Sequence, residues 1–186
     1  MGVNIMVDLE TWGDTNDAAI VSIGAVKFDR MRVLERFHVG VTPESNEIYK
    51  RQITASTMQW WLAEERAEAR KAWFQLEKTD LASALEGFRI WCTTPEEIPF
   101  DGEPYQITAL WGNGATFDNV ILRSACAATG IEYPVPFWQD KCYRTLKGLR
   151  PDIKLERIGT HHDAADDAHS QAEHAIRLAQ AMGILL

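Results

Sequence analysis

Three apolar segments in the first part of the chain have the pattern of β-strands. Residues 3–12 (VNIMVDLETW) are almost wholly apolar until two acidic residues near their end, and residues 18–28 are β-branched and apolar. Residues 36–41 (RFHVGV) alternate between polar and apolar side chains. Short polar turns link the three segments, so we expect an antiparallel meander whose first two strands lie inside the sheet.

Helical spacing follows these strands. In residues 58–73 the spaced apolar positions are Met58, Trp61, Leu62, Ala69, Ala72 and Trp73. The adjacent Trp60 and Trp61 are more typical of a helix core than of a surface on which nucleotide bases stack. A second helix is expected over residues 80–92, with Asp80 as its N-cap, and the proline- and glycine-containing residues 93–105 read as a loop.

The second half of the chain adds one clear strand and two helices. Residues 107–114 (ITALWGNG) form a buried strand that ends in a glycine-flanked turn, and the helix that follows ends before Gly130. Residues 141–146 suit a short strand or a turn, and the last helix is expected over residues 163–182. Together these elements predict one α/β domain, residues 1–186, with a mixed central sheet flanked by helices.

Composition narrows the function classes. The chain has 186 residues, 46% hydrophobic and 25% charged, and it contains no apolar run long enough to span a membrane. We therefore expect a cytoplasmic protein, whose cysteines, Cys92, Cys126 and Cys142, are reduced thiols. The net charge of -8 opposes general attraction to nucleic acid, but metal ions held by acidic residues would attract phosphate locally.

Asp8 and Glu10 are the first candidate site residues. Side chains alternate faces along a strand, so these two carboxylates lie on the same side, about 7 Å apart. A divalent cation between them would turn their repulsion into ligation. The alternative is a strand that simply ends in solvent, and for this pair alone that alternative is the commoner one.

Three further residues stand where strands end or helices begin. Asp118 follows the strand at residues 107–111, where it could either face a ligand or cap the helix. His162 and Asp167 lie at the start of the last helix among alanines, whose small side chains would let the helix approach a neighbour closely. Acids at this position also interact well with the helix dipole, so they need not bind a ligand. Four acids suit two hard cations such as Mg²⁺ or Mn²⁺ roughly 3.5–4 Å apart, and a histidine suits a general base. Two such cations and a general base are the groups needed for hydrolysis of a phosphodiester.

In order and spacing these residues resemble a known family, the DEDDh branch of the DnaQ-like 3′ to 5′ exonucleases, which have a ribonuclease H-like fold. The motifs that match are residues 8–11 (DLET), 113–118 (NGATFD) and 162–168 (HDAADDA), the last in the form H-x-A-x-x-D-A. This form selects His162 and Asp167 rather than His161 and Asp166. The similarity extends over residues 17–24, 58–62, 111–123, 137–146 and the final helix, as in the subgroup with the mycobacterial 3′ to 5′ exoribonuclease and phage exonuclease A.

The resemblance implies a mechanism and a site. Asp8, Glu10, Asp118 and Asp167 would hold two Mg²⁺ or Mn²⁺ ions, and His162 would accept a proton from the attacking water. The implied substrate is single-stranded nucleic acid or a 3′ overhang, cut to nucleoside 5′-monophosphates, with RNA somewhat favoured over DNA. The alternative is a catalytically silent binding or regulatory module of the same fold.

Residues that would hold the substrate are less distinctive. Thr11 and Trp12, directly after the first motif, suit backbone contact and stacking with the terminal nucleotide, although Trp12 equally suits packing. Phe117 is a weaker stacking candidate. Arg144 is the expected phosphate-binding member of the basic residues Lys141, Arg144, Lys147 and Arg150, which could also simply be solvated. The resemblance also suggests a homodimer.

Overall fold

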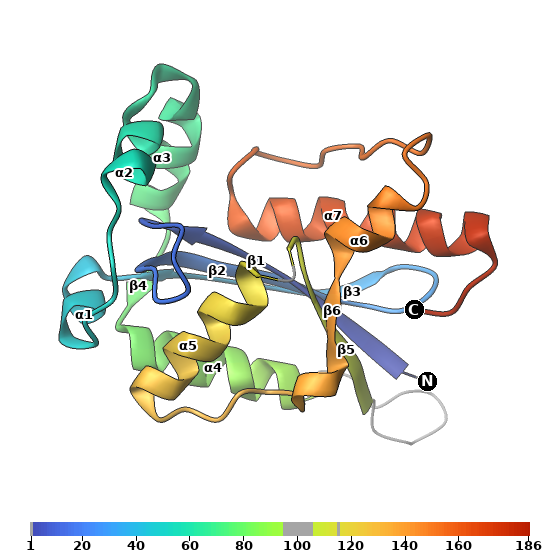
Figure 1. Cartoon of the computed structure of the whole chain (residues 1–186), viewed down its shortest axis with the longest axis horizontal. Coiled ribbons are helices and arrows are strands. Elements are labelled where there is room, and N and C mark those ends of the chain that lie inside the picture. The colour runs from blue at the N-terminus through green and yellow to red at the C-terminus, as the bar shows by residue number, and fades with distance from the viewer. Residues whose placement is uncertain (1, 95–105, 115) are drawn as a thin grey trace.

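A mixed six-stranded sheet forms the centre of the computed structural model, which describes residues 2–94, 106–114 and 116–186 (Figure 1). The strand order is β4-β3-β2-β1-β5-β6, in which β1, β2 and β3 pair antiparallel and the other pairings are parallel. The predicted meander is therefore confirmed, and β1 and β2 are interior strands. The strands are β1 (Gly2–Thr11), β2 (Ile20–Phe28), β3 (Val33–Val41), β4 (Lys78–Thr79), β5 (Gln106–Gly112) and β6 (Asp140–Cys142).

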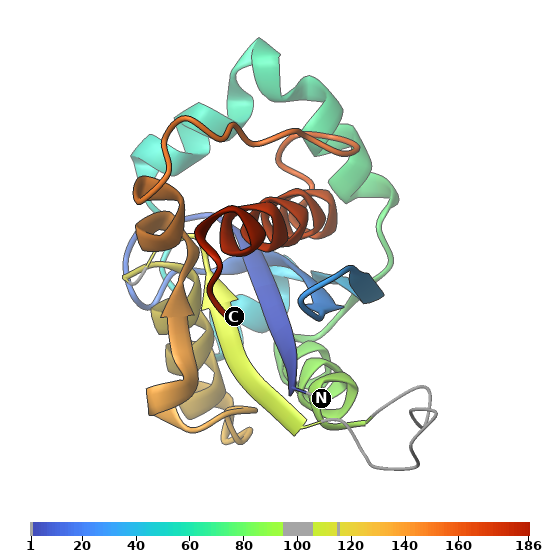
Figure 2. The ribbon, with the colours of Figure 1, turned by 90° about the vertical axis from the view of Figure 1, so that its right-hand side faces the viewer.

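Helices cover both faces of the sheet. The long α7 lies across one face with α6 beside it, and α4 and α5 cover the other face (Figure 2). None of the helices in the described ranges has the length and apolar content to cross a bilayer. The helices are α1 (Pro43–Ile48), α2 (Ala55–Leu62), α3 (Ala67–Gln75), α4 (Leu81–Thr93), α5 (Asp118–Thr129), α6 (Tyr143–Gly148) and α7 (Ala164–Met182), with 3₁₀ turns η1 (Glu64–Arg66) and η2 (Phe137–Gln139).

The alternation of side chains along β1 decides what each face of the sheet buries. Ile5, Val7 and Leu9 belong to the core cluster that also holds the buried residues of α4 and α5. Met6 belongs to the second cluster, with residues of α6 and α7. Asp8 and Glu10 share the parity of Met6, so they project toward the α7 face at the carboxyl end of the strand.

Three sequence predictions need correction. Residues 58–73 are not one helix, because Ala63 adopts an extended conformation (φ -61°, ψ 147°) that ends α2, and Leu62 is consequently exposed. The prediction also missed α1, which has a proline in its first turn and no apolar period. Residues 141–146 are the end of β6 followed by α6, and most of the predicted loop 93–105 lies outside the described residues.

Gly24 sets the closest approach between the sheet and α7. It pairs with Asp8 in the β1–β2 register, and a Cβ at this position would lie 2.0 Å from the Ala164 carbonyl carbon and 2.1 Å from the Ala165 nitrogen. The absence of a side chain at Gly24, together with the buried alanines at the start of α7, lets the helix N-terminus approach the sheet beside Asp8. The same contact therefore shapes the core and brings Asp167 toward β1.

We predict that Gly24→Ala destabilises the protein by at least about 1–3 kcal/mol, the usual cost of forcing extra volume into a packed interior. The added methyl would meet backbone atoms, which move less readily than a flexible side chain. Chemical denaturation followed by circular dichroism measures the change.

Gly87→Ala is the matched control for this substitution. Gly87 lies within α4 and has nothing within 4 Å of a built Cβ, so alanine should stabilise the protein by about 0.5–1 kcal/mol through helix propensity. Equal stability of the two variants would contradict the role assigned to Gly24.

Candidate active site

A cavity of about 300 Å³ opens at the carboxyl ends of β1 and β5, against the N-terminus of α7. Its lining includes the four carboxylates and the histidine selected from the sequence as candidate site residues. They are Asp8, Glu10, Asp118, Asp167 and His162. These residues come from β1, from the start of α5 and from the start of α7 with the turn before it. The structure thus brings together residues that are more than 150 positions apart in the chain.

Asp8 and Glu10 are buried carboxylates that lie close to Asp167. One oxygen from each of the three residues lies within 4.8 Å of the others. Burial, together with the negative charges of the neighbouring acids, raises the pKa of Asp8 and of Glu10 well above the ordinary carboxyl value. Gln171 of α7 partly offsets this for Asp8, because its side-chain amide donates a hydrogen bond of 2.7 Å to Asp8 Oδ1.

Asp118 joins the ends of two strands. Its carboxylate accepts a hydrogen bond of 3.0 Å from the Leu9 N–H and one of 2.8 Å from the Asn113 N–H, at the ends of β1 and β5 respectively. Burial raises the pKa of Asp118 to about 6 despite these two bonds. Asp118 lies in the same cavity but outside the tight group formed by Asp8, Glu10 and Asp167.

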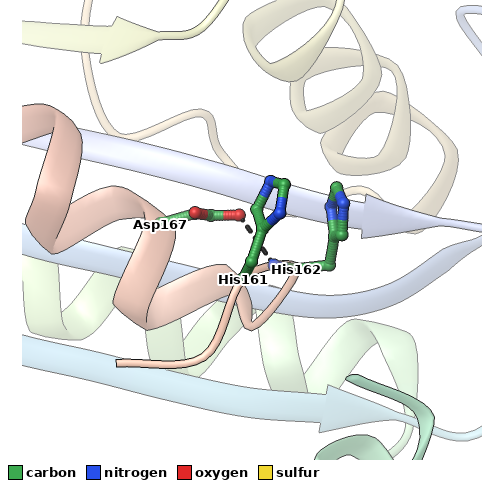
Figure 3. Close-up of side chains that lie close together, drawn as sticks. All are labelled: His161, His162 and Asp167. Carbon is green, nitrogen blue, oxygen red and sulfur yellow. Dashed lines mark hydrogen bonds between the residues drawn. The ribbon is translucent and has the colours of Figure 1, made fainter. Parts of the chain in front are cut away.

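Asp167 holds His162 in place through the backbone. The His162 N–H donates a hydrogen bond of 3.0 Å to Asp167 Oδ2, while Arg157 donates one of 2.8 Å to Oδ1 (Figure 3 shows the first). His162 has a left-handed φ of 65°, a conformation in which histidine is tolerated better than most residues. Its Nδ1 lies 4.0 Å from Glu10 Oε1, and burial lowers the pKa of His162 to about 4.

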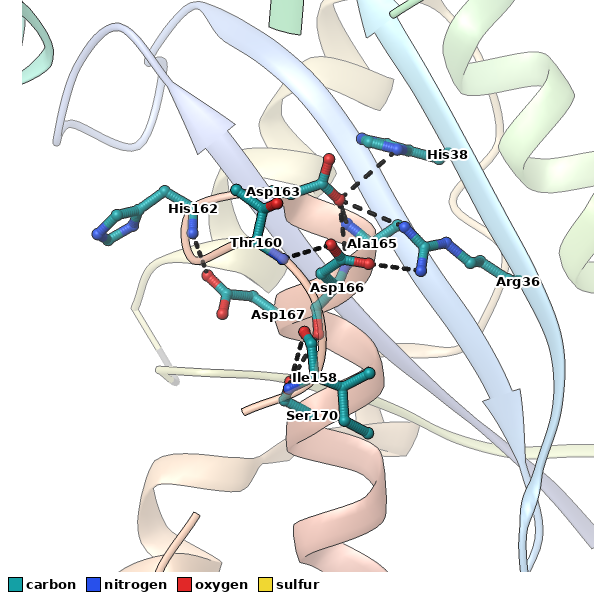
Figure 4. Close-up of polar contacts among 10 residues, drawn as sticks. All are labelled: Arg36, His38, Ile158, Thr160, His162, Asp163, Ala165, Asp166, Asp167 and Ser170. Atoms are coloured by element: carbon teal, nitrogen blue, oxygen red, sulfur yellow. Dashed lines mark hydrogen bonds and ion pairs between the residues drawn. The ribbon is translucent and has the colours of Figure 1, made fainter. Parts of the chain in front are cut away.

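The neighbouring acids Asp163 and Asp166 have structural partners instead. Asp163 is the N-cap of α7 and accepts N–H bonds from Ala165 and Asp166. Arg36 of β3 pairs with Asp166 at 2.6 Å and with Asp163 at 3.4 Å (Figure 4). These contacts fix the start of α7 against the sheet, which agrees with the expectation that the two acids lie outside the ligand set.

Aromatic residues line the cavity, but Trp12 is not one of them. The lining aromatic residues are Trp60, Trp61, Phe117 and Tyr143. Trp60 lines the cavity, and its ring meets the His162 imidazole edge-on at 4.7 Å between centroids. Trp12 is absent from the lining and packs against Trp61 and Trp73 at 5.7 Å and 5.4 Å. The structure therefore favours packing for Trp12, and the expectation that Trp60 is a core residue is not met.

Other predicted contact residues divide between the cavity and the surface. Thr11 and Phe117 line the cavity, although the Thr11 hydroxyl already donates to the Gly13 carbonyl. Among the basic residues, Arg144 and Lys147 of α6 line it as well. Lys141 and Arg150 do not, and Arg150 pairs with Asp152.

The donor set fits divalent cations. Buried carboxylate oxygens within a few ångströms of one another are hard ligands of the kind that Mg²⁺ and Mn²⁺ prefer. The raised pKa values of Asp8, Glu10 and Asp118 show that the arrangement is unfavourable when the acids are ionised without a counter-charge. A bound cation would remove this penalty.

Gln171, Arg157 and His161 are cavity residues that the sequence did not reveal. Gln171 follows Asp167 by four positions on α7, so helical spacing could have placed it on the same face. Arg157 and His161 come from the irregular segment before α7, in which no periodic pattern indicates where a side chain points.

Comparisons with known proteins agree with this arrangement. A family model described as the 3′-5′ exoribonuclease Rv2179c-like domain matches residues 3–178. No curated protein matches the sequence. Among solved structures, the nuclease domain of 3′hExo, a DEDDh family member bound to rAMP, is similar with a TM-score of 0.65 and 16% identity, over 99% of this chain and 94% of that one.

Two other solved structures share the fold. Exonuclease X in complex with 5′ overhanging duplex DNA has a TM-score of 0.57 and 17% identity, over 97% of this chain and 93% of that one. E. coli Exonuclease I with a dA16 oligonucleotide has a TM-score of 0.61 and 16% identity, over 97% of this chain and 41% of that one. These likenesses confirm the expected ribonuclease H-like fold.

We predict that the buried carboxyl groups of the metal-free site destabilise the folded protein increasingly as the pH rises from about 4 through about 6. Carboxyl groups in the unfolded chain have a pKa near 4, whereas the pKa of folded Asp118 is about 6 and those of Asp8 and Glu10 are also raised. Within that window these carboxyl groups bind more protons in the folded state, so raising the pH favours unfolding, whereas His162, whose pKa falls to about 4, contributes with the opposite sign. Melting temperatures of wild type and Asp118→Asn in EDTA isolate the carboxyl contribution, because the melting temperature of wild type should fall relative to that of the variant as the pH rises through this range.

Glu10→Gln should raise the melting temperature of the metal-free protein at pH 7, by about 2–4 °C for each kcal/mol of repulsion removed. No hydrogen bond to Glu10 occurs among the described residues, so the amide removes charge without losing a partner. Glu64→Gln, at an exposed site, is the control. A Glu10 variant that is less stable in EDTA would contradict burial of the charge and repulsion by the neighbouring acids as the sources of the raised pKa.

Proposed function

Because the chain belongs to the family of Rv2179c-like 3′-5′ exoribonuclease domains, we propose that it hydrolyses single-stranded or 3′-overhanging nucleic acid from the 3′ end, RNA in preference to DNA. Residues 1–186 act as one exonuclease domain, and the products are nucleoside 5′-monophosphates. The observation that carries the proposal is the meeting of four buried acids and one neutral histidine around a single cavity.

The four carboxylates, Asp8, Glu10, Asp118 and Asp167, would hold two divalent cations, Mg²⁺ or Mn²⁺. Such cations lower the pKa of water and stabilise negative charge on the leaving 3′ oxygen. Asp8 would serve both ions, because it belongs to the close group with Glu10 and Asp167 and also experiences the charge of Asp118. Gln171 orients the Asp8 carboxylate through its hydrogen bond to Oδ1.

His162 is the proton acceptor. Its lowered pKa, about 4, leaves the ring neutral at physiological pH, so a nitrogen lone pair is available to take a proton from water. No partner for Nε2 occurs among the described residues. The bond from the His162 N–H to Asp167 fixes the ring relative to the carboxylates, and the Trp60 edge limits its rotation.

Two kinds of side chain in the cavity lining suit the two parts of a nucleotide. Trp60 offers an aromatic face for the terminal base, and bases stack on such faces with little regard to their identity. Arg144, Lys147 and Arg157 offer positive charge for the phosphates, which compensates locally for the acidic net charge of the chain. The homodimer that the resemblance suggests stays a prediction.

Degradation of 3′-tailed oligonucleotides tests the activity. Wild-type protein with Mg²⁺ or Mn²⁺ should release 5′-mononucleotides from labelled RNA and, more slowly, from matched DNA, and EDTA should stop the reaction. Asp8→Ala should reduce the rate by more than about 100-fold, the upper range for a residue that only supports a metal ligand. Asp152→Ala, which removes an exposed carboxylate outside the cavity, is the control.

Two results would overturn the proposal. Equal rates for wild type and Asp8→Ala would point to a contaminating nuclease. Binding of the oligonucleotide without hydrolysis under any metal would favour the catalytically silent module instead.

Trp60→Ala should weaken the binding of a 3′-terminal phosphorothioate oligonucleotide by roughly 5- to 150-fold, the equivalent of about 1–3 kcal/mol for one stacked base. Trp138→Ala is the matched control, because Trp138 is exposed and does not line the cavity. Fluorescence anisotropy in Ca²⁺ measures both affinities. If the two variants bind alike, Trp60 is not the stacking surface.

A further inference from the structure

His161, His162 and Asp167 form a cluster that the proposed reaction does not require as a unit. One ligand atom from each of the three side chains lies within 4.8 Å of the others (Figure 3). The two imidazole rings are 3.6 Å apart between centroids and nearly parallel, with an interplanar angle of 23°. Two nitrogen donors and one oxygen donor therefore lie close together beside the carboxylate site, and the stacked rings must open for their in-plane lone pairs to point at one ion.

The backbone conformation at His162 brings the two histidine side chains together. His162 has a φ of 65°, and this left-handed turn brings two consecutive side chains to one side of the chain. The turn is braced by the Asp167 carboxylate, which accepts the His162 N–H, and by Asp166, which accepts the Thr160 N–H at 2.7 Å (Figure 4). Because the bracing atoms belong to the first turn of α7, the backbone that carries the two histidines is held in place, while the exposed His161 ring is free to rotate toward an ion.

The donor types select a different class of metal from the carboxylates. Imidazole is a ligand of Zn²⁺, Ni²⁺, Cu²⁺ and Co²⁺, whereas Mg²⁺ takes oxygen ligands almost exclusively. Ligands of a tetrahedral Zn²⁺ with bonds near 2.0–2.1 Å lie about 3.3 Å apart, so the donor atoms must approach one another, and the two rings must rotate out of their stack to do so.

We propose that His161, His162 and Asp167 form a site for a transition-metal dication of the Zn²⁺ class, and that filling this site inhibits the enzyme. Binding would occupy the imidazole assigned as proton acceptor and one of the carboxylates assigned to the Mg²⁺ site. The site itself stands on its geometry alone, whereas the inhibition rests on the proposed exonuclease function.

Arg157 provides a second test of the site, because its removal should change the metal affinity in the opposite direction to the removal of His161. Its guanidinium donates to Asp167 Oδ1 at 2.8 Å, so it places a positive charge where the dication would bind. Loss of His161 should weaken binding because a ligand is removed. Loss of the Arg157 charge should strengthen metal binding. Damage to the fold would weaken binding in both variants, so it would not produce two opposite effects.

Titration with Co²⁺ in the presence of excess Mg²⁺ tests the site, because four-coordinate Co²⁺ with nitrogen ligands absorbs visible light far more strongly than Co²⁺ in a six-coordinate oxygen site. Wild type should develop this absorption and lose it on addition of Zn²⁺. His161→Gln should weaken the binding by more than about tenfold, since even groups that only support a ligand contribute 10- to 100-fold. Arg157→Met should strengthen it.

His169→Gln is the matched control, because His169 also belongs to α7 but pairs with Glu173 outside the cavity. This variant should bind Co²⁺ as wild type does. A His161 variant with unchanged absorption, or a wild type that develops none, would overturn the site. These spectra do not depend on turnover, so they test the metal site even if no exonuclease activity is found.

The inhibition has its own measurement. Zn²⁺ should slow Mg²⁺-dependent hydrolysis by wild type, and His161→Gln should need at least about tenfold more Zn²⁺ for the same fractional loss of its own activity. Equal sensitivity of the two proteins would mean that Zn²⁺ acts by replacing Mg²⁺ at the carboxylates, and would overturn the inhibitory role.

Discussion

Repulsion among buried carboxylates is the constraint on which the structure of this site depends. Asp8, Glu10, Asp118 and Asp167 are each less than a tenth exposed, and their charges face one cavity. Removing ionised groups from water is costly unless other charges or donors compensate. The sheet and α7 must hold the acids together against this cost, and the hydrophobic clusters on the two faces of the sheet provide the favourable free energy.

Hydrogen-bond donors of the protein compensate only part of the negative charge of the acids. The positions of these donors explain how the site is built. Asp118 receives two backbone N–H groups, Asp167 receives one N–H and the Arg157 guanidinium, and Asp8 receives the Gln171 amide. Each donor also ties together two elements of the fold, such as the ends of β1 and β5. The polar contacts that stabilise the acids are therefore the same contacts that fix their geometry, while enough repulsion remains to favour a cation.

The parts of the site that lie on regular strands and helices could be predicted from the sequence, because side chains there repeat with a known period. Alternation along β1 placed Asp8 and Glu10 on one face, and the buried alanines of α7 indicated a helix that approaches its neighbour closely. Irregular backbone could not be predicted in this way. Ala63 breaks the helical pattern, so Leu62 becomes exposed and Trp60 faces the cavity, while Trp12 turns into the aromatic cluster with Trp61 and Trp73.

The turn before α7 shows why irregular segments carry so much of the chemistry. A proton acceptor must be neutral, close to the carboxylates and unable to swing away, and a left-handed residue braced by Asp167 meets all three conditions at His162. A neutral imidazole beside a carboxylate is also a good ligand for softer metals, and the same turn stacks His161 on His162. The proposed general base and the proposed transition-metal site therefore share one turn, and the charge of Arg157 opposes any cation bound at Asp167.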